Sequence, residues 1–379
     1  MGSSRPPVRR AAGLGRRSAV IGLALLGWLG LAATPRAADR VVNVYNWSDY
    51  IDPKMLDAFT KETGIKVVYD TYDTNEIVES KLLAGRSGYD IVVPSGPFLQ
   101  RLIRAGVFQK LDKAKLPNLT NLWPEVTQRL QAYDPGNLYA VDYMWGTTGI
   151  GLATAKVRAV LGAATPLNSW DLMFKPEYAD KLKACGLYML DAPEDVLPNA
   201  LRYLGLDPNS KAQADLQRAA DLLMKVRGDV RKFHSSEYIN ALANGDICAA
   251  VGYSGDVLQA RKRAKEADNG VEISYLVPKE GALMWFDSFA IPADAPNAEA
   301  AHAFINFMLK PEVAAANTNF VSFASGNLAA KAFVAPAILN DPGIYPDEAT
   351  MTRLFTNTAY DDKTQRLATR LWTRVRTGH

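Results

Sequence analysis

Strands and helices alternate at short intervals after residue 40, and this alternation restricts the fold more than any other feature of the chain. Residues 41–45, VVNVY, are β-branched and apolar and predict a buried strand. Asp52 and Pro53 are predicted to be the N-cap and first position of a helix that Gly64 ends. Further strands are predicted at 65–69 and 89–93. Such βαβ units build a mostly parallel sheet covered by helices, which is an α/β fold.

The alternation continues less regularly through the rest of the chain. A helix that begins near Asp73 is expected to bury Ile77, Val78 and Leu82. Later helices are predicted at 169–174, 193–203, 212–226, 236–244 and 301–308, and a strand is predicted at 247–253. With 379 residues, 48% of them hydrophobic, the chain is long enough for two domains with separate cores. We therefore expect two α/β lobes joined by short crossings.

Residues 1–38 follow the order of segments typical of a secretory signal peptide. Arginines come first, an apolar run follows at 19–33, and small residues precede cleavage after Ala37 or Ala38. The alternative is a membrane anchor, but this run is shorter than the ~20 residues that a span requires. The pair Arg16-Arg17 raises a twin-arginine route, although a bare pair is a weak signal. We expect a cleaved signal and no membrane span in the mature chain.

The charge distribution argues against a nucleic-acid partner. The formal net charge is +3, but residues 1–38 contain six arginines and no acid, so the rest of the chain is slightly acidic. A nucleic-acid-binding protein needs a basic patch in its folded part, and the sequence shows none.

Cys185 and Cys248 are the two cysteines of the chain. Export places them in an oxidising compartment, where an even pair tends to form a disulfide. Such a bridge would contribute roughly 3–4 kcal/mol in the chain-entropy model. The alternative is a pair of buried free thiols. Because the chain has only three scattered histidines, we expect no structural zinc site.

The motifs of common enzyme classes are missing from the sequence. It contains no phosphate-binding loop, no HExxH zinc motif and no GxSxG nucleophile elbow. Residues 252–256, GYSGD, have the wrong spacing for that elbow. Three histidines offer few general bases of suitable pKa. We expect a protein that is not an enzyme and needs no cofactor, with carboxylate-based catalysis as the remaining alternative.

Three short segments combine aromatic rings with a carboxylate next to a predicted strand. They are residues 45–50 (YNWSDY), 252–256 (GYSGD) and 284–289 (MWFDSF). Residues just beyond the carboxyl ends of strands line the ligand crevice in open α/β sheets. In an extended segment Trp285 and Asp287 point to the same side. Several rings and several acids are therefore expected to face one cleft.

An organic cation suits such a cleft. A primary ammonium has three donors and no acceptor, so carboxylates satisfy it. Its methylene chain packs on flat rings, which also attract the charged ends. Each residue taken alone is more often a core ring, a turn former or a helix cap than a ligand contact. The threefold recurrence is what favours a binding site.

Long stretches of the chain resemble the putrescine- and spermidine-binding periplasmic proteins of bacterial ABC polyamine importers. The resemblance runs from about Val41 to the C-terminus. It is carried by YNWSDYI at 45–51, KETGIKVVYD at 61–70, DIVVPS at 90–95, MWGTTGIG at 144–151, FHSSEYIN at 233–240 and ANGDIC at 243–248.

The resemblance implies a type II periplasmic binding protein, in which two α/β lobes with hinge crossings close over a central cleft. The first lobe would comprise 40–147 plus 288–330, and the second 148–287 plus 331–379. The family's two bridged cysteines match Cys185 and Cys248.

The family's binding residues carry over to particular positions of this chain. Asp256 and Asp287 would hold ammonium groups, Trp285 would stack on the methylene chain, and Ser95 would add a polar contact. One wall would be formed by Trp47, Ser48, Asp49 and Tyr50.

Some ligand positions depart from the putrescine-type pattern. Asp195 stands where a longer Glu is common, Tyr253 where Trp is frequent, and Phe323 where Tyr is usual. Trp285 resembles spermidine-preferring members, whereas Ser48 and Asp49 are putrescine-like. We expect a polyamine ligand and favour putrescine over spermidine.

The implied role is capture in the periplasm and delivery to an inner-membrane permease, by a monomer that binds no nucleic acid. One alternative is a sensor that presents the same module to a membrane receptor. Others are a same-fold protein for another small ligand and a secreted hydrolase.

Overall fold

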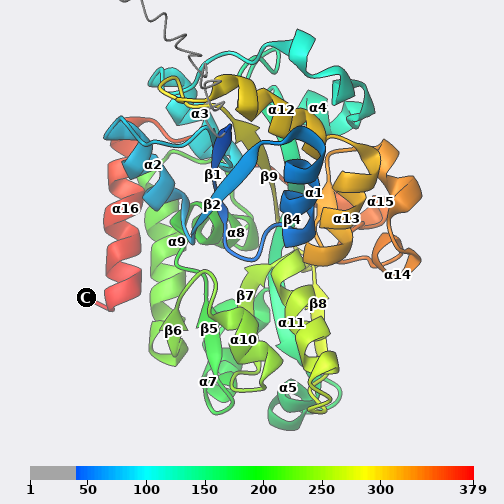
Figure 1. Cartoon of the computed structure of the whole chain (residues 1–379). Coiled ribbons are helices and arrows are strands. Elements are labelled where there is room, and N and C mark those ends of the chain that lie inside the picture. The colour runs from blue at the N-terminus through cyan, green and yellow to red at the C-terminus, as the bar shows by residue number, and fades with distance from the viewer. Residues whose placement is uncertain (1–39) are drawn as a thin grey trace, which may run out of the picture. The chain divides into compact units, whose positions relative to one another are not determined.

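The computed structural model describes residues 40–379, and the predicted signal peptide at 1–38 lies outside them. A ten-stranded sheet has the order β2-β1-β3-β9-β4-β7-β5-β6, and β8 and β10 also pair with β4 (Figure 1). The strands are β1 Val41–Trp47, β2 Lys66–Tyr72, β3 Ile91–Val92, β4 Ala140–Ala153, β5 Leu187–Met189, β6 Lys232–Phe233, β7 Ala249–Tyr253, β8 Ile273–Leu276, β9 Leu283–Ala290 and β10 Ala324–Ser325.

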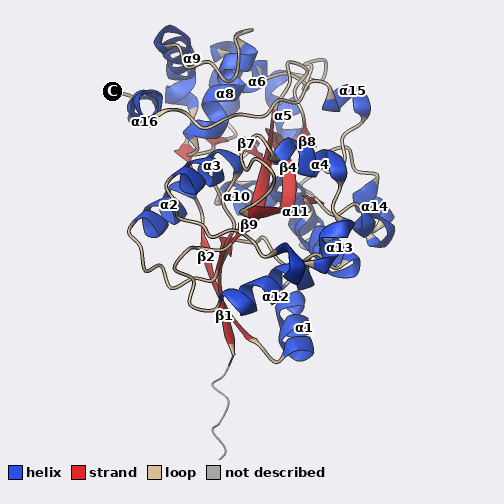
Figure 2. Cartoon of the chain, turned by 90° about the horizontal axis from the view of Figure 1, so that it is seen from above, coloured by secondary structure: helices blue, strands red, loops and turns tan. Residues whose placement is uncertain are grey.

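Helices lie around these strands (Figure 2). They are α1 Pro53–Thr63, α2 Asn75–Leu83, α3 Gly96–Arg104, α4 Pro124–Leu130, α5 Thr154–Leu161, α6 Asp171–Phe174, α7 Pro176–Lys183, α8 Pro193–Tyr203, α9 Gln213–Val226, α10 Tyr238–Ala243, α11 Ser254–Glu266, α12 Ala298–Met308, α13 Pro311–Val321, α14 Pro336–Leu339, α15 Glu348–Met351 and α16 Asp362–Thr377. The helices predicted at 193–203 and 212–226 are confirmed as α8 and α9.

The sheet is mixed, so the expectation of a mostly parallel sheet is wrong. β1 pairs in parallel with β2 and β3, and β5 with β6 and β7, as βαβ units require. β9 runs antiparallel to its neighbours β3 and β4, and β4 also runs antiparallel to β7. The 14-residue β4 pairs with β9 through Ala140–Thr148 and with β7 through Thr148–Leu152, so one strand belongs to both halves of the sheet.

The first helix begins and ends where the sequence predicts. The Asp52 side chain accepts a hydrogen bond from the Lys54 amide, Pro53 takes the first position, and Gly64 ends the helix in the left-handed conformation at φ 70°. In α2 the cap is Thr74 rather than Asp73. Val78 and Leu82 are buried there as expected, whereas Ile77 is 47% exposed. Val78 and Leu82 lie one turn apart and so share one face of α2.

The buried side chains form separate cores in the two halves of the sheet. Two clusters together form what we call the first core. One cluster includes Val44, Phe289 and Phe304, and the other includes Val92 and Phe286. The second core is built by residues between 150 and 273, together with Tyr360 and residues between 368 and 375 of α16. The segment that includes Ile344 and Tyr345 packs on the first core.

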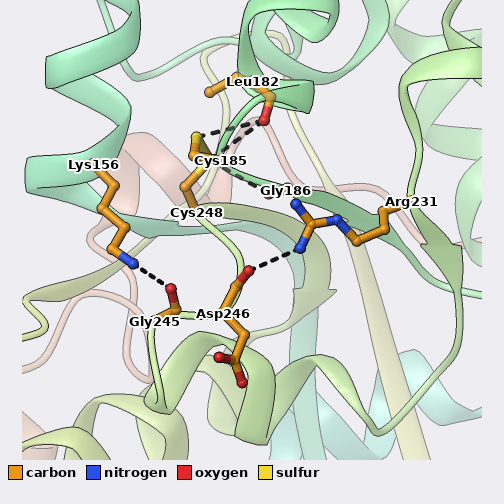
Figure 3. Close-up of a disulfide and its surroundings, with 8 residues drawn as sticks. All are labelled: Lys156, Leu182, Cys185, Gly186, Arg231, Gly245, Asp246 and Cys248. Carbon is orange, nitrogen blue, oxygen red and sulfur yellow. Dashed lines mark hydrogen bonds between the residues drawn. A yellow bond between two sulfur atoms is a disulfide. The ribbon is translucent and has the colours of Figure 1, made fainter.

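A disulfide joins Cys185 and Cys248, which confirms the predicted bridge (Figure 3). It ties Cys185, two residues after the end of α7, to the residue just before β7. Arg231 Nη1 donates a hydrogen bond to the carbonyl of Asp246 at 3.0 Å, and Lys156 donates to the carbonyl of Gly245. The bridge therefore lies beside a loop that is also held by two basic side chains.

Candidate ligand-binding site

A pocket of about 710 Å³, part of it open to solvent, lies where the strands of both halves end. Trp47, Asp73 and Ser95 lie at or just beyond the ends of β1, β2 and β3. This is where an open α/β sheet binds its ligand. The other lining residues are Ser48, Tyr50, Tyr72, Asn75, Pro97, Phe98, Glu194, Asp195, Ser235, Ser236, Ile239, Tyr253, Asp256, Leu283, Trp285, Asp287, Phe323 and Asn357.

The Asp287 carboxylate is oriented by side chains of the first half. Because strand residues alternate, β9 points Asp287 and Trp285 to the same face. Tyr50 Oη donates to Asp287 Oδ2 at 2.9 Å, and Ser95 Oγ donates to Oδ1 at 2.6 Å. Ser95 Oγ in turn accepts a hydrogen bond from Asn75 Nδ2 at 3.0 Å. These hydrogen bonds therefore fix the position of the carboxylate in the wall.

Two further carboxylates reach the pocket from the first turns of α8 and α11. Thr148 Oγ1 donates to Asp195 Oδ1 at 2.9 Å. Tyr238 Oη donates to Asp256 Oδ2 at 2.7 Å. Carboxylates near a helix N-terminus are favoured by the helix dipole. Each of these acids is thus supported from behind by a hydroxyl, as Asp287 is.

Aromatic rings form the walls between the carboxylates. Trp285 packs edge-on against Tyr253 and Phe323, with ring centroids 5.6 and 5.3 Å apart. Two glycines make room for these rings. A Cβ at Gly146 would lie 2.6 Å from the Trp285 ring, and a Cβ at Gly255 would lie 2.5 Å from the Phe323 ring.

At the opposite wall the Trp47 ring lies 4.7 Å from that of Tyr72. Trp47 Nε1 donates to the Val93 carbonyl at 2.9 Å, and this bond holds the indole in place.

The pocket concentrates negative charge in a buried place. Burial raises the pKa of Asp195, Asp256 and Asp287 to about 7. Within the described residues, none of the side chains that line the pocket is a lysine or an arginine. These three acids therefore lack a cationic partner in the wall, and a bound cation would supply one.

Glu194 differs from the other acids of the pocket. Its Oε1 lies 2.9 Å from Arg101 Nη1, and Arg101 also pairs with Glu79 at 2.9 Å. Burial raises the pKa of Glu194 to about 7, and Arg101 opposes that shift. Arg101 comes from α3 and Glu194 from α8, so this ion pair joins the two halves beside the pocket.

Ten of the eleven ligand residues predicted from the sequence line this pocket. They are Trp47, Ser48, Tyr50, Ser95, Asp195, Tyr253, Asp256, Trp285, Asp287 and Phe323. The structure does not place Asp49 with them. Asp49 adopts φ 55°, and its Oδ1 lies 3.0 Å from Arg263 Nη2.

Several lining residues were missed by the sequence reasoning. Asp73 and Asn75 come four and six residues after the predicted strand 65–69, which the structure extends to Tyr72, and their place beyond a strand is the signal that could have identified them. Glu194 precedes the predicted Asp195 by one residue. Ser235 and Asn357 come from loops, and no local pattern marks them.

Neither a metal centre nor a membrane span emerges from the described part of the chain. No three His, Cys, Asp or Glu side chains of residues 40–379 are grouped to hold a metal ion. None of the helices in that range has both the length and the hydropathy needed to cross a bilayer.

Comparisons with known proteins agree with this geometry. A family model described as "Bacterial extracellular solute-binding protein" matches residues 54–346. The chain is 54% identical to the putrescine-binding periplasmic protein SpuD of Pseudomonas aeruginosa, over 95% of this chain and 98% of that protein. It is 52% identical to the putrescine-binding periplasmic protein PotF of Escherichia coli, over 91% and 94% of the two chains.

A solved structure shows a similar fold. It is the spermidine/putrescine ABC transporter substrate-binding protein PotD of Streptococcus pneumoniae, with a TM-score of 0.73 and 31% identity. The match covers 89% of this chain and 99% of that one.

Proposed function

This chain belongs to the family of bacterial extracellular solute-binding proteins, and from that premise we propose that it captures a polyamine, with putrescine as the preferred ligand. As a member of a solute-binding family the chain is a transport component rather than an enzyme. The proposal places it in the periplasm, where it delivers its ligand to the permease of an ABC importer. Its two 52–54% identical relatives bear the names of periplasmic putrescine-binding proteins.

The observation that carries the proposal is the set of Asp195, Asp256 and Asp287 in one aromatic pocket whose described lining holds no cationic side chain. Burying an ionised carboxylate without a partner is unfavourable. A diammonium ion supplies a partner at each end, and its methylene chain replaces water on the ring faces.

The pocket residues receive distinct proposed roles. Asp287 and Asp256 each hold an ammonium group, and Trp285 stacks on the chain between them. The Asp195 carboxylate is proposed as a further acceptor for the ligand. Tyr253 lies beside it, with its Oη 3.5 Å from Asp195 Oδ2. Trp47, Ser48, Tyr50, Ser95 and Phe323 complete the wall of the first half.

Capture is proposed to work by closure of two lobes, 40–147 plus 288–330 and 148–287 plus 331–379. The separate cores of the two halves support this division. Trp285 and Phe286 of β9 belong to the first core, and Ile344 and Tyr345 pack on it. We therefore propose to assign β9, with Asp287, to the first lobe and to move the last boundary of the second lobe toward α16. Only the closed arrangement brings Asp287 and Asp256 to one ligand, so binding shifts the population toward closure. The functional unit is proposed to be a monomer without affinity for nucleic acid.

Isothermal titration calorimetry with putrescine, cadaverine, agmatine and spermidine tests the ligand class. The control ligand is 1,4-butanediol, which has the length of putrescine without its charge. We expect saturable binding of the amines at micromolar concentration or tighter and no binding of the diol. Absence of heat and of a thermal shift with all four amines would remove the polyamine proposal.

A further inference from the structure

Asp142 is a buried carboxylate that the proposed polyamine site does not use. Its side chain lies near the start of β4 and is 2% exposed. Within the described residues neither of its oxygens has a hydrogen-bond partner. Such a group is unusual in a folded protein, because a buried charge is normally paired or hydrogen-bonded.

A bulge in the sheet directs Asp142 away from the main pocket. Asp142 pairs with Ser288, but after a shift in register Met144 pairs with Asp287. Opposite residues of an antiparallel pair share a face of the sheet, so Asp142 shares a face with Ser288 and Met144 shares the other face with Asp287. The Ser288 hydroxyl is also buried without a partner among the described residues. Two unsatisfied polar groups thus lie together behind the strand that carries Asp287.

Asp142 lines a second cavity of about 1230 Å³, part of it open to solvent. The lining of this cavity contains aliphatic side chains and one carboxylate, whereas the lining of the main pocket contains aromatic rings and several carboxylates. Its apolar walls are Leu111, Leu119, Leu122, Pro124 and Leu130.

The polar lining of this cavity points to the same kind of ligand. Asn137 contributes a buried Oδ1 that has no partner among the described residues, while its Nδ2 donates to the Thr127 carbonyl at 3.1 Å. Lys113 lies at the rim, where its Nζ donates to the Gly136 carbonyl at 3.1 Å. The unpaired atoms on Asp142 and Asn137 are acceptors, so the matching ligand group is a donor.

We propose that this cavity is a second binding site, which takes a primary alkylamine with its ammonium on Asp142 and its chain between the leucines. The ammonium would donate to Asp142 and to Asn137 Oδ1, and the Ser288 hydroxyl would donate to the carboxylate once Asp142 is ionised. Burial and the neighbouring Asp287 raise the pKa of the Asp142 carboxyl well above its usual range. A paired cation would therefore also keep this carboxyl ionised.

The cavity selects a monoamine over a diamine. Among its described lining residues Asp142 is the one carboxylate, so a second ammonium would have no partner. Lys113 at the rim would repel that second charge. A ligand with one charged end and an apolar tail, such as n-hexylamine, satisfies both the acid and the leucines. The two sites thus differ in the number of charges they accept.

Titration of n-hexylamine into protein already saturated with putrescine tests the second site, with calorimetry and the methyl NMR signals of the cavity leucines as readouts. We expect saturable binding that D142N weakens at least tenfold. 1-Hexanol, which lacks the charge, should bind at least tenfold more weakly than the amine. No saturable binding, equal binding to D142N, or displacement of hexylamine by putrescine would overturn the proposal.

A second variant keeps the test decisive if D142N fails to fold. K113E changes an exposed rim residue, and it should tighten hexylamine binding severalfold while leaving hexanol unaffected. An unchanged or weaker affinity for hexylamine would contradict the second site. Should putrescine itself not bind, the same titration on the ligand-free D287N variant still tests this cavity, so the two proposals fail separately.

Discussion

At the scale of single residues, the polyamine proposal depends on where three carboxylates lie and on what surrounds them. Asp287 accepts short hydrogen bonds at both oxygens, from Tyr50 at 2.9 Å and from Ser95 at 2.6 Å. Replacing it with Asn keeps the shape and removes the charge that an ammonium group would pair with.

Asp287→Asn should weaken putrescine binding at least about 30-fold, because losing one partner of a buried ion pair costs about 2 kcal/mol or more. Ser95→Ala should cost less, about 1 kcal/mol, because it removes one hydrogen bond to the carboxylate. Calorimetry measures both, with Asp57→Asn on the exposed face of α1 as the matched control. An affinity of D287N within threefold of the control would rule Asp287 out as an ammonium ligand.

The raised pKa values of Asp195, Asp256 and Asp287 predict opposite pH dependences for binding and for stability. Putrescine needs the ionised acids, so its affinity should fall as the pH drops from 8 to 6, and binding should release protons at pH 7. Calorimetry in buffers of different ionisation enthalpy measures that release.

The ligand-free protein should show the reverse trend in stability. The folded-state pKa of these acids, about 7, exceeds their unfolded value of about 4. The folded state therefore holds more protons between these values, and the contribution of the three acids to the free energy of unfolding falls as the pH rises through that range. Urea unfolding at pH 5 and 8 measures it. A putrescine affinity that does not change between pH 8 and 6, with no release of protons on binding, would contradict the raised pKa values of these acids.

Residue-level reasoning from the sequence predicted ten residues that line the candidate pocket, because rings and acids recur just beyond strands. Asp49 lies outside that lining, and nothing in YNWSDY predicts its left-handed backbone conformation or its ion pair with Arg263. Ser235 and Asn357 reach the pocket through the tertiary fold. Their neighbours in the sequence carry no pattern that predicts this.

At the scale of elements, the helix caps and apolar periodicity sufficed to predict α1, α8, α9 and α12. The long strand β4 was not predicted, and neither was the antiparallel direction of β4 and β9. Every residue of β4 is buried, so it lacks the alternation that identifies a half-exposed strand. Strand direction depends on the connections between elements, which local patterns do not encode.

The close approach of α11 to Phe323 depends on Gly255, where a Cβ would lie 2.5 Å from the ring. Gly255→Ala should destabilise the protein by about 1–3 kcal/mol through overpacking, and it should weaken ligand binding because Phe323 lines the pocket. Urea unfolding and calorimetry measure the two effects. Gly228→Ala is the control, since a Cβ there meets nothing within 4 Å. Equal stabilities of the two variants would refute the packing argument.

The disulfide should stabilise the second half without taking part in binding. Cys185 and Cys248 are 63 residues apart, and neither lines the pocket. The double variant C185A/C248A should lose about 2–4 kcal/mol of unfolding free energy and keep its putrescine affinity within about threefold. Thermal unfolding and calorimetry test this. A large loss of affinity in a folded double variant would show that the bridge positions binding residues.

At the scale of the whole described chain, two cores share one long strand, and the acids come from both sides of it. Asp287 belongs to β9 of the first half, whereas Asp195 and Asp256 belong to helices of the second. The ion pairs Arg101–Glu194 and Arg263–Asp49 also join the halves. A ligand bound to Asp287 of the first half and to Asp256 of the second would therefore link the halves in addition to these two ion pairs.

A crystal structure of the protein grown with putrescine tests this arrangement at the level of atoms. We expect one nitrogen of the diamine within hydrogen-bonding distance of Asp287, the other within that distance of Asp256, and the methylene chain against the Trp285 ring. A diamine bound elsewhere, or bound in this pocket with both nitrogens remote from these two carboxylates, would contradict the proposed mode of capture even though the fold and family would stand.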